Sequence, residues 1–313
     1  MSDVLPLVSI CCLTYNHAAF IRKCLDGFLM QQTSFPVEIL IHDDASTDGT
    51  DDIVKEYTAK YPDKIFPLFE TENKYSNGYV GKMDITFNYS RAKGKYIASC
   101  EGDDYWTDPL KLQKQVDFME AHPDYSVCWH RTKHWLAEKD KWSDDDCGAL
   151  TQGKEGVDID LSTFFSRWYT QPLSMVFRKS MFNPEWQKKY RHYRDTYEIY
   201  HLLKEGKGYL FSFVGGVYVK HGGGIAAMND YGKACFFELE SAEELFRENH
   251  DPITYDYWKN VVLWSMDYFN REGLRKVLIK RCLNTSFIGS LEVCWTNMKH
   301  KVKKCGKTGL PCK

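Results

Sequence analysis

The 313-residue chain has no apolar run that approaches the length needed to cross a bilayer. Its amino terminus also lacks the basic, apolar and small-residue pattern of a signal peptide. Its eleven cysteines include no CxxC pair, and several fall within apolar segments, where cysteine acts as a small core residue. A formal net charge of -2 gives no signal for binding nucleic acid. We therefore expect a globular protein of the reducing cytoplasm.

A glycine-rich phosphate loop is also missing after the first predicted strand, which spans residues 8–16. The segment 14–19 reads TYNHAA, whereas a nicotinamide dehydrogenase would carry GxGxxG at this place. A sugar-nucleotide pyrophosphorylase would carry a glycine-rich, basic loop there. Both classes of enzyme are therefore disfavoured.

What the chain does have is an alternation of strand and helix patterns. After the first strand, apolar residues recur at helical spacing from Phe20 to Leu29, and a second strand at 37–41 precedes a helical stripe from Ile53. This βαβα order predicts an α/β domain with a mainly parallel sheet. The later patterns predict a helix from Asp108, a strand at 125–129, a polar excursion at 136–160, a helix at 161–168, a strand at 174–178, a helix at 194–203, strands at 209–214 and 217–220, and helices from 229 to 298.

One apolar strand runs directly into two adjacent carboxylates, Asp103 and Asp104. Open α/β folds bind ligands at the carboxyl ends of their strands, and paired acids there suit a divalent cation that carries phosphates. Neighbouring residues on extended backbone point to opposite sides, so one cation does not readily take both carboxylates. The alternative interpretation is an Asx turn followed by the cap of the helix that begins at Asp108.

Four segments occur in the order and spacing typical of one enzyme family: TYN at 14–16, HDDASTDGT at 42–50, AKGKYI at 92–97 and EGDDYW at 101–106. With these segments the chain resembles the inverting family 2 glycosyltransferases of the GT-A fold, especially those of bacterial surface polysaccharide synthesis. The resemblance covers residues 7–225 and includes the segment VYVKHGGG at 217–224.

The resemblance also implies a division of the chain. A GT-A catalytic domain is expected at 1–228, with a nucleotide-binding half at about 1–125 and an acceptor half at about 126–228. Residues 229–313 would form a helical carboxyl-terminal extension with a basic tail, because ten Lys or Arg residues and one acid follow from Arg275 onward. Basic residues interleaved with apolar ones suit an amphipathic helix on an anionic membrane. They also suit a helix packed on the catalytic domain.

By the resemblance, Asp104 coordinates the Mg²⁺ or Mn²⁺ that bridges the two donor phosphates, and Asp103 holds the ribose or an ordered water. His221 supplies another metal ligand or a hydrogen bond to a phosphate, and Lys82 lies in a loop that the family uses near the phosphates. A metal is expected because departure of a nucleoside diphosphate builds negative charge that a Lewis acid stabilises. From the residues alone, His221 equally suits a packed strand end, and Lys82 a solvated loop.

Tyr15 and Asp44 lie on adjacent predicted βα loops and are the candidates for holding the base. Tyr15 offers a flat ring and Asp44 an acceptor for the imide N–H of uracil; core packing and helix capping are their structural alternatives. Asp195, at the start of a predicted helix, is the candidate general base that deprotonates the acceptor hydroxyl. Glu198, one turn later, is the alternative base, and a helix N-cap is the alternative role of Asp195.

Together these features predict an inverting, metal-dependent transfer of a sugar from a UDP-sugar to a saccharide or lipid-linked acceptor. Nucleic acid is not an expected partner. The protein is expected in the cytoplasm, and contact of its basic tail with the inner face of the cytoplasmic membrane is a further hypothesis. The rival is a non-catalytic sugar-nucleotide-binding or scaffold protein, which would keep Tyr15 and Asp44 and need no base.

Overall fold

The computed structural model describes residues 5–79, 81–166, 170–191, 193–222 and 231–286. The chain divides into two compact units, residues 1–224 and 225–313. The boundary that the sequence predicts after residue 228 lies outside the described residues.

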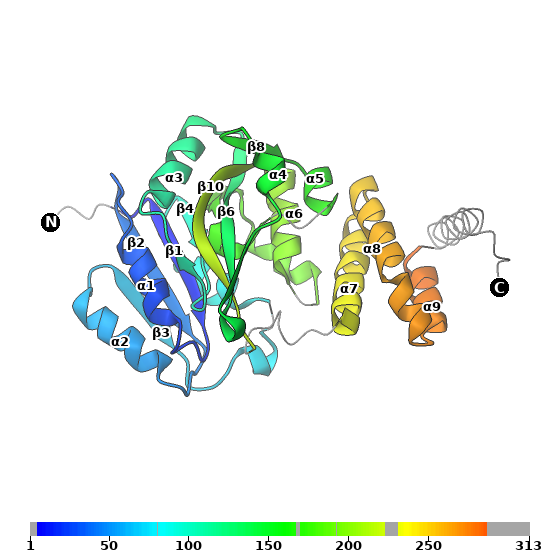
Figure 1. Ribbon diagram of the computed structural model, residues 1–313, viewed down its shortest axis with the longest axis horizontal. Coiled ribbons are helices and arrows are strands. Elements are labelled where there is room, and N and C mark those ends of the chain that lie inside the picture. Colours follow the sequence, from blue (N-terminus) through cyan, green and yellow to red (C-terminus); the bar gives the residue numbers. More distant parts are fainter. Residues whose placement is uncertain (1–4, 80, 167–169, 192, 223–230, 287–313) are drawn as a thin grey trace. The chain divides into compact units, whose positions relative to one another are not determined.

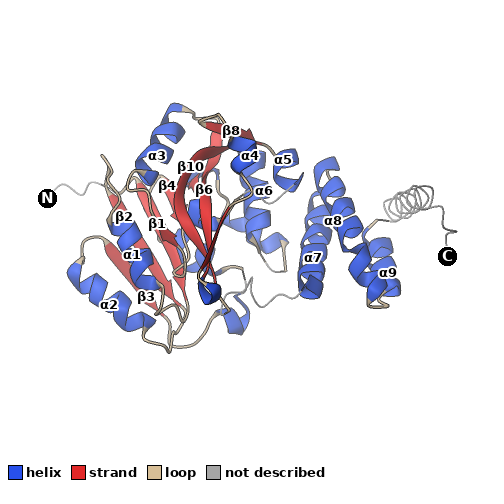
Figure 2. Ribbon diagram, viewed as in Figure 1, coloured by secondary structure: helices blue, strands red, loops and turns tan. Residues whose placement is uncertain are grey.

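The first unit is built on one mixed sheet, whose strands are drawn in red in Figure 2. The strand order is β3-β2-β1-β4-β9-β6-β10-β5. Strands β3, β2, β1 and β4 run parallel, as do β6 and β10, and β9 lies antiparallel between β4 and β6. Strand β7 pairs with β6, and β8 with β10. The strands are β1 Val8–Thr14, β2 Val37–Asp43, β3 Ile65–Phe69, β4 Tyr96–Ser99, β5 Tyr105–Trp106, β6 Tyr125–Leu136, β7 Lys141–Asp144, β8 Gly156–Ile159, β9 Val176–Arg178 and β10 Lys207–Lys220. The expected α/β fold is confirmed.

Three helices share one hydrophobic core with one face of this sheet (Figure 1). They are α1 Ile21–Leu29, α2 Thr50–Lys60 and α3 Lys111–Ala121. Helix α1 forms where apolar residues recur at positions i, i+3, i+4 and i+7 from Ile21, and all four are buried. Burial of each such side chain is worth about 1.5–3 kcal/mol.

The opposite face of the sheet packs against α6 (Asp195–Glu205) and a helical turn at Asp84–Tyr89. In β9, Val176 belongs to the core beneath α1–α3, whereas the ring of Phe177 lies 5.4 Å from that of Tyr89. Successive strand residues point to opposite faces, so the two residues separate the two layers. The smaller elements of this unit are α4 Gly148–Thr151, α5 Leu161–Ser166 and short helical turns at Tyr75–Tyr79, Ala137–Lys139, Pro172–Ser174, Lys179–Met181 and Pro184–Lys189.

Two predicted regions differ from the structure. The strands expected at 209–214 and 217–220 form the single strand β10, whose register with β6 shifts between Leu210 and Gly216. In the sequence, Gly215 and Gly216 separate the two predicted strands. A Cβ on Gly215 would lie 2.8 Å from the His130 ring, so close packing explains this glycine. The polar excursion at 136–160 contains β7, α4 and β8.

The second unit contains three described helices, α7 Tyr231–Asn249, α8 Pro252–Arg271 and α9 Arg275–Thr285. Helix α8 begins where Oδ1 of Asp251 accepts a hydrogen bond from the Thr254 amide at 2.8 Å and Pro252 takes the first helical position. The helical character expected from residue 229 is therefore seen throughout the described part. Within the described residues, every helix is too short or too polar to span a bilayer.

Candidate active site

Three strand ends meet at one edge of the sheet. Strands β1 and β4 are parallel, and β10 has the same direction because β9 is antiparallel to both β4 and β6. His17 follows β1, Asp103 and Asp104 follow β4, and His221 follows β10. This carboxyl edge is where open α/β sheets bind their ligands, and it is the candidate site.

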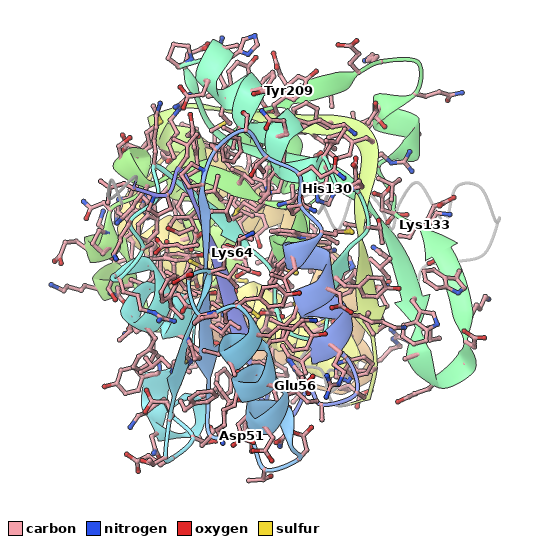
Figure 3. All side chains as sticks on the ribbon, turned by 90° about the vertical axis from the view of Figure 1, so that its left-hand side faces the viewer. Asp51, Glu56, Lys64, His130, Lys133 and Tyr209 are labelled. Carbon is pink, nitrogen blue, oxygen red and sulfur yellow. The ribbon has the colours of Figure 1, made fainter. Side chains whose placement is uncertain are left out.

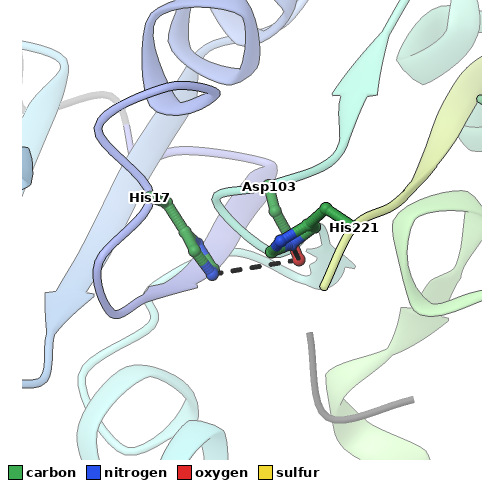
Figure 4. Close-up of side chains that lie close together, drawn as sticks. All are labelled: His17, Asp103 and His221. Atoms are coloured by element: carbon green, nitrogen blue, oxygen red, sulfur yellow. Dashed lines mark hydrogen bonds and ion pairs between the residues drawn. The ribbon is translucent and has the colours of Figure 1, made fainter. Parts of the chain in front are cut away.

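His17, Asp103 and His221 converge at this edge and form what we term the His–Asp–His cluster (Figure 4). Nε2 of His221 lies 2.9 Å from Oδ2 of Asp103, and Nε2 of His17 lies 3.8 Å from the same oxygen. The three potential ligand atoms lie within 4.8 Å of one another. In the part of the chain that the structure describes, Oδ1 of Asp103 is buried without a hydrogen-bond partner. Three potential metal ligands thus converge here, and among the described residues Oδ1 of Asp103 has no other partner.

The electrostatics of the cluster suit metal ligation. Burial lowers the pKa of His17, and this outweighs the opposing effect of the Asp103 charge. For Asp103, burial raises the pKa, but the hydrogen bond with His221 and the charge of His17 bring it below the usual value. Near neutral pH, Asp103 is therefore ionised and His17 is neutral. These are the protonation states that a metal ligand requires.

The donor set also discriminates between the two expected cations. Mg²⁺ is a hard cation that prefers oxygen ligands in octahedral geometry, whereas this cluster offers two imidazole nitrogens and one carboxylate. The residues therefore fit a divalent cation, and among the two expected ions they fit Mn²⁺ better.

Asp104 has different surroundings. Its Oδ1 accepts a hydrogen bond from the Val219 amide at 2.8 Å, and its side chain is buried against β10. Burial and then the charge of Asp103 raise the pKa of Asp104. The structure therefore brings His221 together with Asp103, and places Asp104 where it ties the acidic loop to β10.

The loops after β1 and β2 are braced against each other by hydrogen bonds. The amide of His17 donates to Oγ1 of Thr50 at 2.8 Å, and the amide of Asn16 donates to Oγ of Ser46 at 2.9 Å. Asn16 adopts a left-handed backbone conformation, with φ of 56°, which asparagine tolerates better than most residues. Polar residues of the segment 42–50 thus fix the backbone that carries His17.

The two residues expected to hold the base lie close in sequence to this bracing. Tyr15 follows β1 and is 45% exposed, so its ring is available to a ligand. Asp44 is buried, and its two carboxylate oxygens accept hydrogen bonds from the amides of Lys74 and Tyr75 at 2.6 and 3.0 Å. Asp44 therefore shapes the loop at residues 73–75.

Lys82 lies in a loop that contacts the segment before α6. A Cβ on the preceding residue, Gly81, would collide with the carbonyl oxygen of Tyr193, and Gly81 has a positive φ of 71°. Only glycine satisfies both constraints without strain. The loop of Lys82 therefore packs against Tyr193, which precedes Asp195 by two positions in the sequence.

Asp195 is the first residue of α6, and Arg194 holds the N-cap position. Desolvation by surrounding protein raises the pKa of Asp195, and desolvation followed by the charges of Asp103 and Asp195 raises that of Glu101. Both side chains still reach solvent. Glu198 is buried and accepts a hydrogen bond from the hydroxyl of Tyr89 at 3.3 Å. Of the two candidate bases, Asp195 is thus the one that solvent reaches.

Two residues of this edge escaped the sequence reasoning. His17 carried no motif signal of its own, although its place directly after a strand end could have marked it. Tyr218 lies on β10; burial raises its pKa, and four nearby carboxylates raise it further. These four acids are Asp104, Glu101, Asp103 and Asp195. The charges of Asp195 and of Asp103 in the cluster therefore both act on Tyr218.

An α/β sheet whose strand ends gather polar and charged side chains at one edge is typical of a nucleotide-binding enzyme domain. The family model of glycosyl transferase family 2 matches residues 9–200, and the chain belongs to this family. The family and the class of enzyme expected from the sequence are confirmed.

Two relatives match part of the chain in sequence. Rv1520, an uncharacterized protein of Mycobacterium tuberculosis, is 40% identical over 172 residues, which are 55% of this chain and 47% of Rv1520. The Escherichia coli UDP-Glc:alpha-D-GlcNAc-diphosphoundecaprenol beta-1,3-glucosyltransferase WfaP is 35% identical over 117 residues, which are 37% of this chain and 43% of WfaP. The matches span less than half the length of these two relatives.

Solved structures share the fold. The S. aureus protein TarS (residues 1–349, in complex with UDP-GlcNAc) gives a TM-score of 0.68 at 14% identity, covering 98% of this chain and 93% of TarS 1–349. The Pyrobaculum calidifontis mannosyltransferase PcManGT, in complex with GDP-Man and Mn²⁺, gives 0.51 at 15% identity, covering 96% of this chain and 81% of PcManGT. With the family match, the likeness to TarS confirms the expected GT-A type of fold.

Proposed function

We propose that this chain is an inverting glycosyltransferase that moves a sugar from a UDP-sugar to a hydroxyl of a saccharide or lipid-linked saccharide. The observation that carries the proposal is the His–Asp–His cluster at the carboxyl edge of the sheet. The charges of Asp103 in this cluster and of Asp195 both act on Tyr218. The name of WfaP describes a UDP-glucose donor and a diphosphoundecaprenol-linked acceptor, and TarS was crystallised with UDP-GlcNAc. Both support a UDP-sugar donor for this chain.

On the donor side, the His–Asp–His cluster would hold Mn²⁺. When bound, the cation stabilises the negative charge that builds on the departing UDP. The exposed ring of Tyr15 stacks on the uracil, and Lys82 adds positive charge beside the phosphates. Asp44 contributes by fixing the amides of Lys74 and Tyr75, which shape the rim of the base site. The complex of PcManGT with Mn²⁺ supports the choice of cation.

On the acceptor side, Asp195 acts as the general base. It takes the proton of the acceptor hydroxyl while the hydroxyl oxygen forms a bond to the anomeric carbon. The bond between that carbon and the UDP oxygen breaks at the same time, and attack from the opposite side inverts the configuration. Its raised pKa makes Asp195 a stronger base than an ordinary aspartate. Glu198 has a structural role in this proposal, because it accepts the hydrogen bond of Tyr89.

The test is a screen of purified protein against UDP-sugars, scored first by thermal stabilisation with and without Mn²⁺ and then by release of UDP. We expect at least one UDP-sugar to stabilise the protein more with Mn²⁺ than without it. Metal-enhanced binding without any product, equal in the wild type and in Asp195→Asn, would establish the scaffold alternative instead.

We further propose that the protein acts at the cytoplasmic face of the membrane, because a lipid-linked acceptor would lie there. The basic tail in which the sequence predicts membrane contact begins at Arg275, and its residues after 286 lie outside the described residues. In its described part, α9 exposes Val277 and Ile279 beside Lys276 and Lys280. Co-sedimentation with anionic and neutral vesicles, for the full chain and for a truncation after Asn297, tests the contact. Equal binding by both proteins would remove the role of the tail.

A further inference from the structure

A pair of stacked tryptophans lies on the hairpin formed by β6 and β7. The rings of Trp135 and Trp142 face each other with centroids 5.9 Å apart and planes 21° apart. The hairpin, marked by Lys133, stands out from the sheet in Figure 3. All four residues of β7 are exposed, and Trp142 is 49% exposed. A large indole there contributes little to the core, so its exposure calls for another explanation.

Contacts connect this pair to the candidate active site. Nζ of Lys23 lies 4.9 Å from the centroid of the Trp135 ring and 5.5 Å from that of Tyr105, the residue after Asp104. One turn before Lys23, the ring of Phe20 lies 4.6 Å from that of His221. An aromatic and cationic strip therefore runs from the His–Asp–His cluster to Trp135 and the exposed Trp142.

The backbone repeats this connection. Trp135 pairs with Val219 in the register of β6 and β10, and Val219 is two residues before His221. At the tip of the hairpin, a Cβ on Gly222 would lie 2.5 Å from Oε1 of Glu138. The hairpin is thus fixed against the segment that supplies the histidine ligand.

The order of the strands places the strip and the Tyr15 loop on opposite sides of β4. Tyr15 and the bracing loops follow β1 and β2, whereas the hairpin extends β6, on the other side of β4. A donor whose base lies at β1 and β2 and whose phosphates lie at the His–Asp–His cluster leaves the hairpin side for the second substrate.

The chemistry of the strip suits a sugar. The flat face of a pyranose carries C–H groups that pack on an indole ring, while its hydroxyls need polar partners at the rim. Nζ of Lys23 lies over the face of the Trp135 ring, and Asp140 accepts a hydrogen bond from Nε1 of Trp135 at 3.0 Å, which orients the ring. We propose that the exposed ring of Trp142, supported from behind by the stacked ring of Trp135, forms a binding platform for the saccharide chain of the acceptor. This inference rests on the proposed function and assigns its acceptor subsite.

The experiment is binding of fluorescently labelled protein to an array of bacterial surface glycans, without any nucleotide, followed by titration of the strongest glycan. We expect Trp142→Ala to weaken binding roughly five- to tenfold, and Trp142→Tyr, which keeps a flat ring, to restore part of the loss. The matched control is Phe66→Ala, an exposed aromatic of the edge strand β3, which should bind as the wild type does. Circular dichroism confirms that each variant is folded.

Three outcomes would overturn the platform: no glycan bound by the wild type, equal binding by the wild type and Trp142→Ala, or an equal loss in Phe66→Ala. The proposed function fails separately, if the wild type releases no UDP from any UDP-sugar.

Discussion

Oδ2 of Asp103 lies 2.9 Å from Nε2 of His221, although 118 residues separate the two in the chain. Each residue directly follows or closely follows a strand of the same direction, so the sheet itself brings the pair together. His17, from a third strand end, completes the group. The arrangement of side chains at this edge is therefore a product of sheet topology.

The first prediction separates the two neighbouring aspartates. Asp103→Asn should abolish the enhancement of UDP binding by Mn²⁺, because the cation loses its only anionic ligand in the His–Asp–His cluster. Asp104→Asn is the matched control and should keep the enhancement, since an amide oxygen can still accept the hydrogen bond of Val219. Calorimetric titration of UDP with and without Mn²⁺ measures both. If the control loses the enhancement and Asp103→Asn keeps it, the ligand assignment is wrong.

The second prediction concerns the general base. Asp195→Asn should lower turnover by roughly two to four orders of magnitude, with UDP and Mn²⁺ affinity near the wild-type values. Glu198→Gln should cost much less, because Glu198 is buried against Tyr89. The base must be ionised, so kcat should fall as the pH drops below the raised pKa of Asp195. The reverse ranking of the two variants would move the base to Glu198.

The third prediction concerns a buried lysine in α3. Nζ of Lys111 lies 3.8 Å from the centroid of the Trp106 ring and has no hydrogen-bond partner among the described residues. Burial lowers the pKa of Lys111 to about 7, against roughly 10.4 in the unfolded chain. Between these values the unfolded state binds a proton that the folded state does not, so this lysine makes the protein less stable as the pH falls from about 10 to 7.

Lys111→Met should therefore raise the free energy of unfolding at pH 7 by on the order of 3 kcal/mol, and by much less at pH 10. Urea unfolding at both pH values measures the difference. Lys114→Met, at an exposed position of the same helix, is the control and should change little at either pH. A gain that is equal at both pH values would contradict the role assigned to burial of the charge.

The fourth prediction compares two glycines with nearly the same backbone. Gly81 and Gly153 have φ of 71° and 72°, but a Cβ collides with Tyr193 at Gly81 and meets open space at Gly153. Gly153→Ala should cost only backbone strain, about 1–2 kcal/mol. Gly81→Ala must displace its loop, so we expect a larger loss of stability and a higher KM for the donor, through Lys82. Equal donor KM values in the two variants would show that this loop does not serve the donor.

Much of the fold could be predicted because strand and helix patterns alternate clearly through the first half of the chain. The position of the acidic pair after an apolar strand also predicted the edge of the sheet at which the candidate site lies. The sequence could not show which aspartate faces the histidines, because that depends on the hydrogen bond between Asp104 and the amide of Val219 in a distant strand. The break expected between residues 214 and 217 is absent, because Gly215 serves close packing on His130 and does not end the strand.

The bracing between the loops after β1 and β2 has a consequence for engineering. Because the amides of Asn16 and His17 are held by the side chains of Ser46 and Thr50, neither loop keeps its shape when the other is exchanged. A graft that changes the nucleotide preference would have to transplant residues 14–18 and 42–50 as one piece. In hydrogen exchange, the amides of the two loops should open together, as a single cooperative segment.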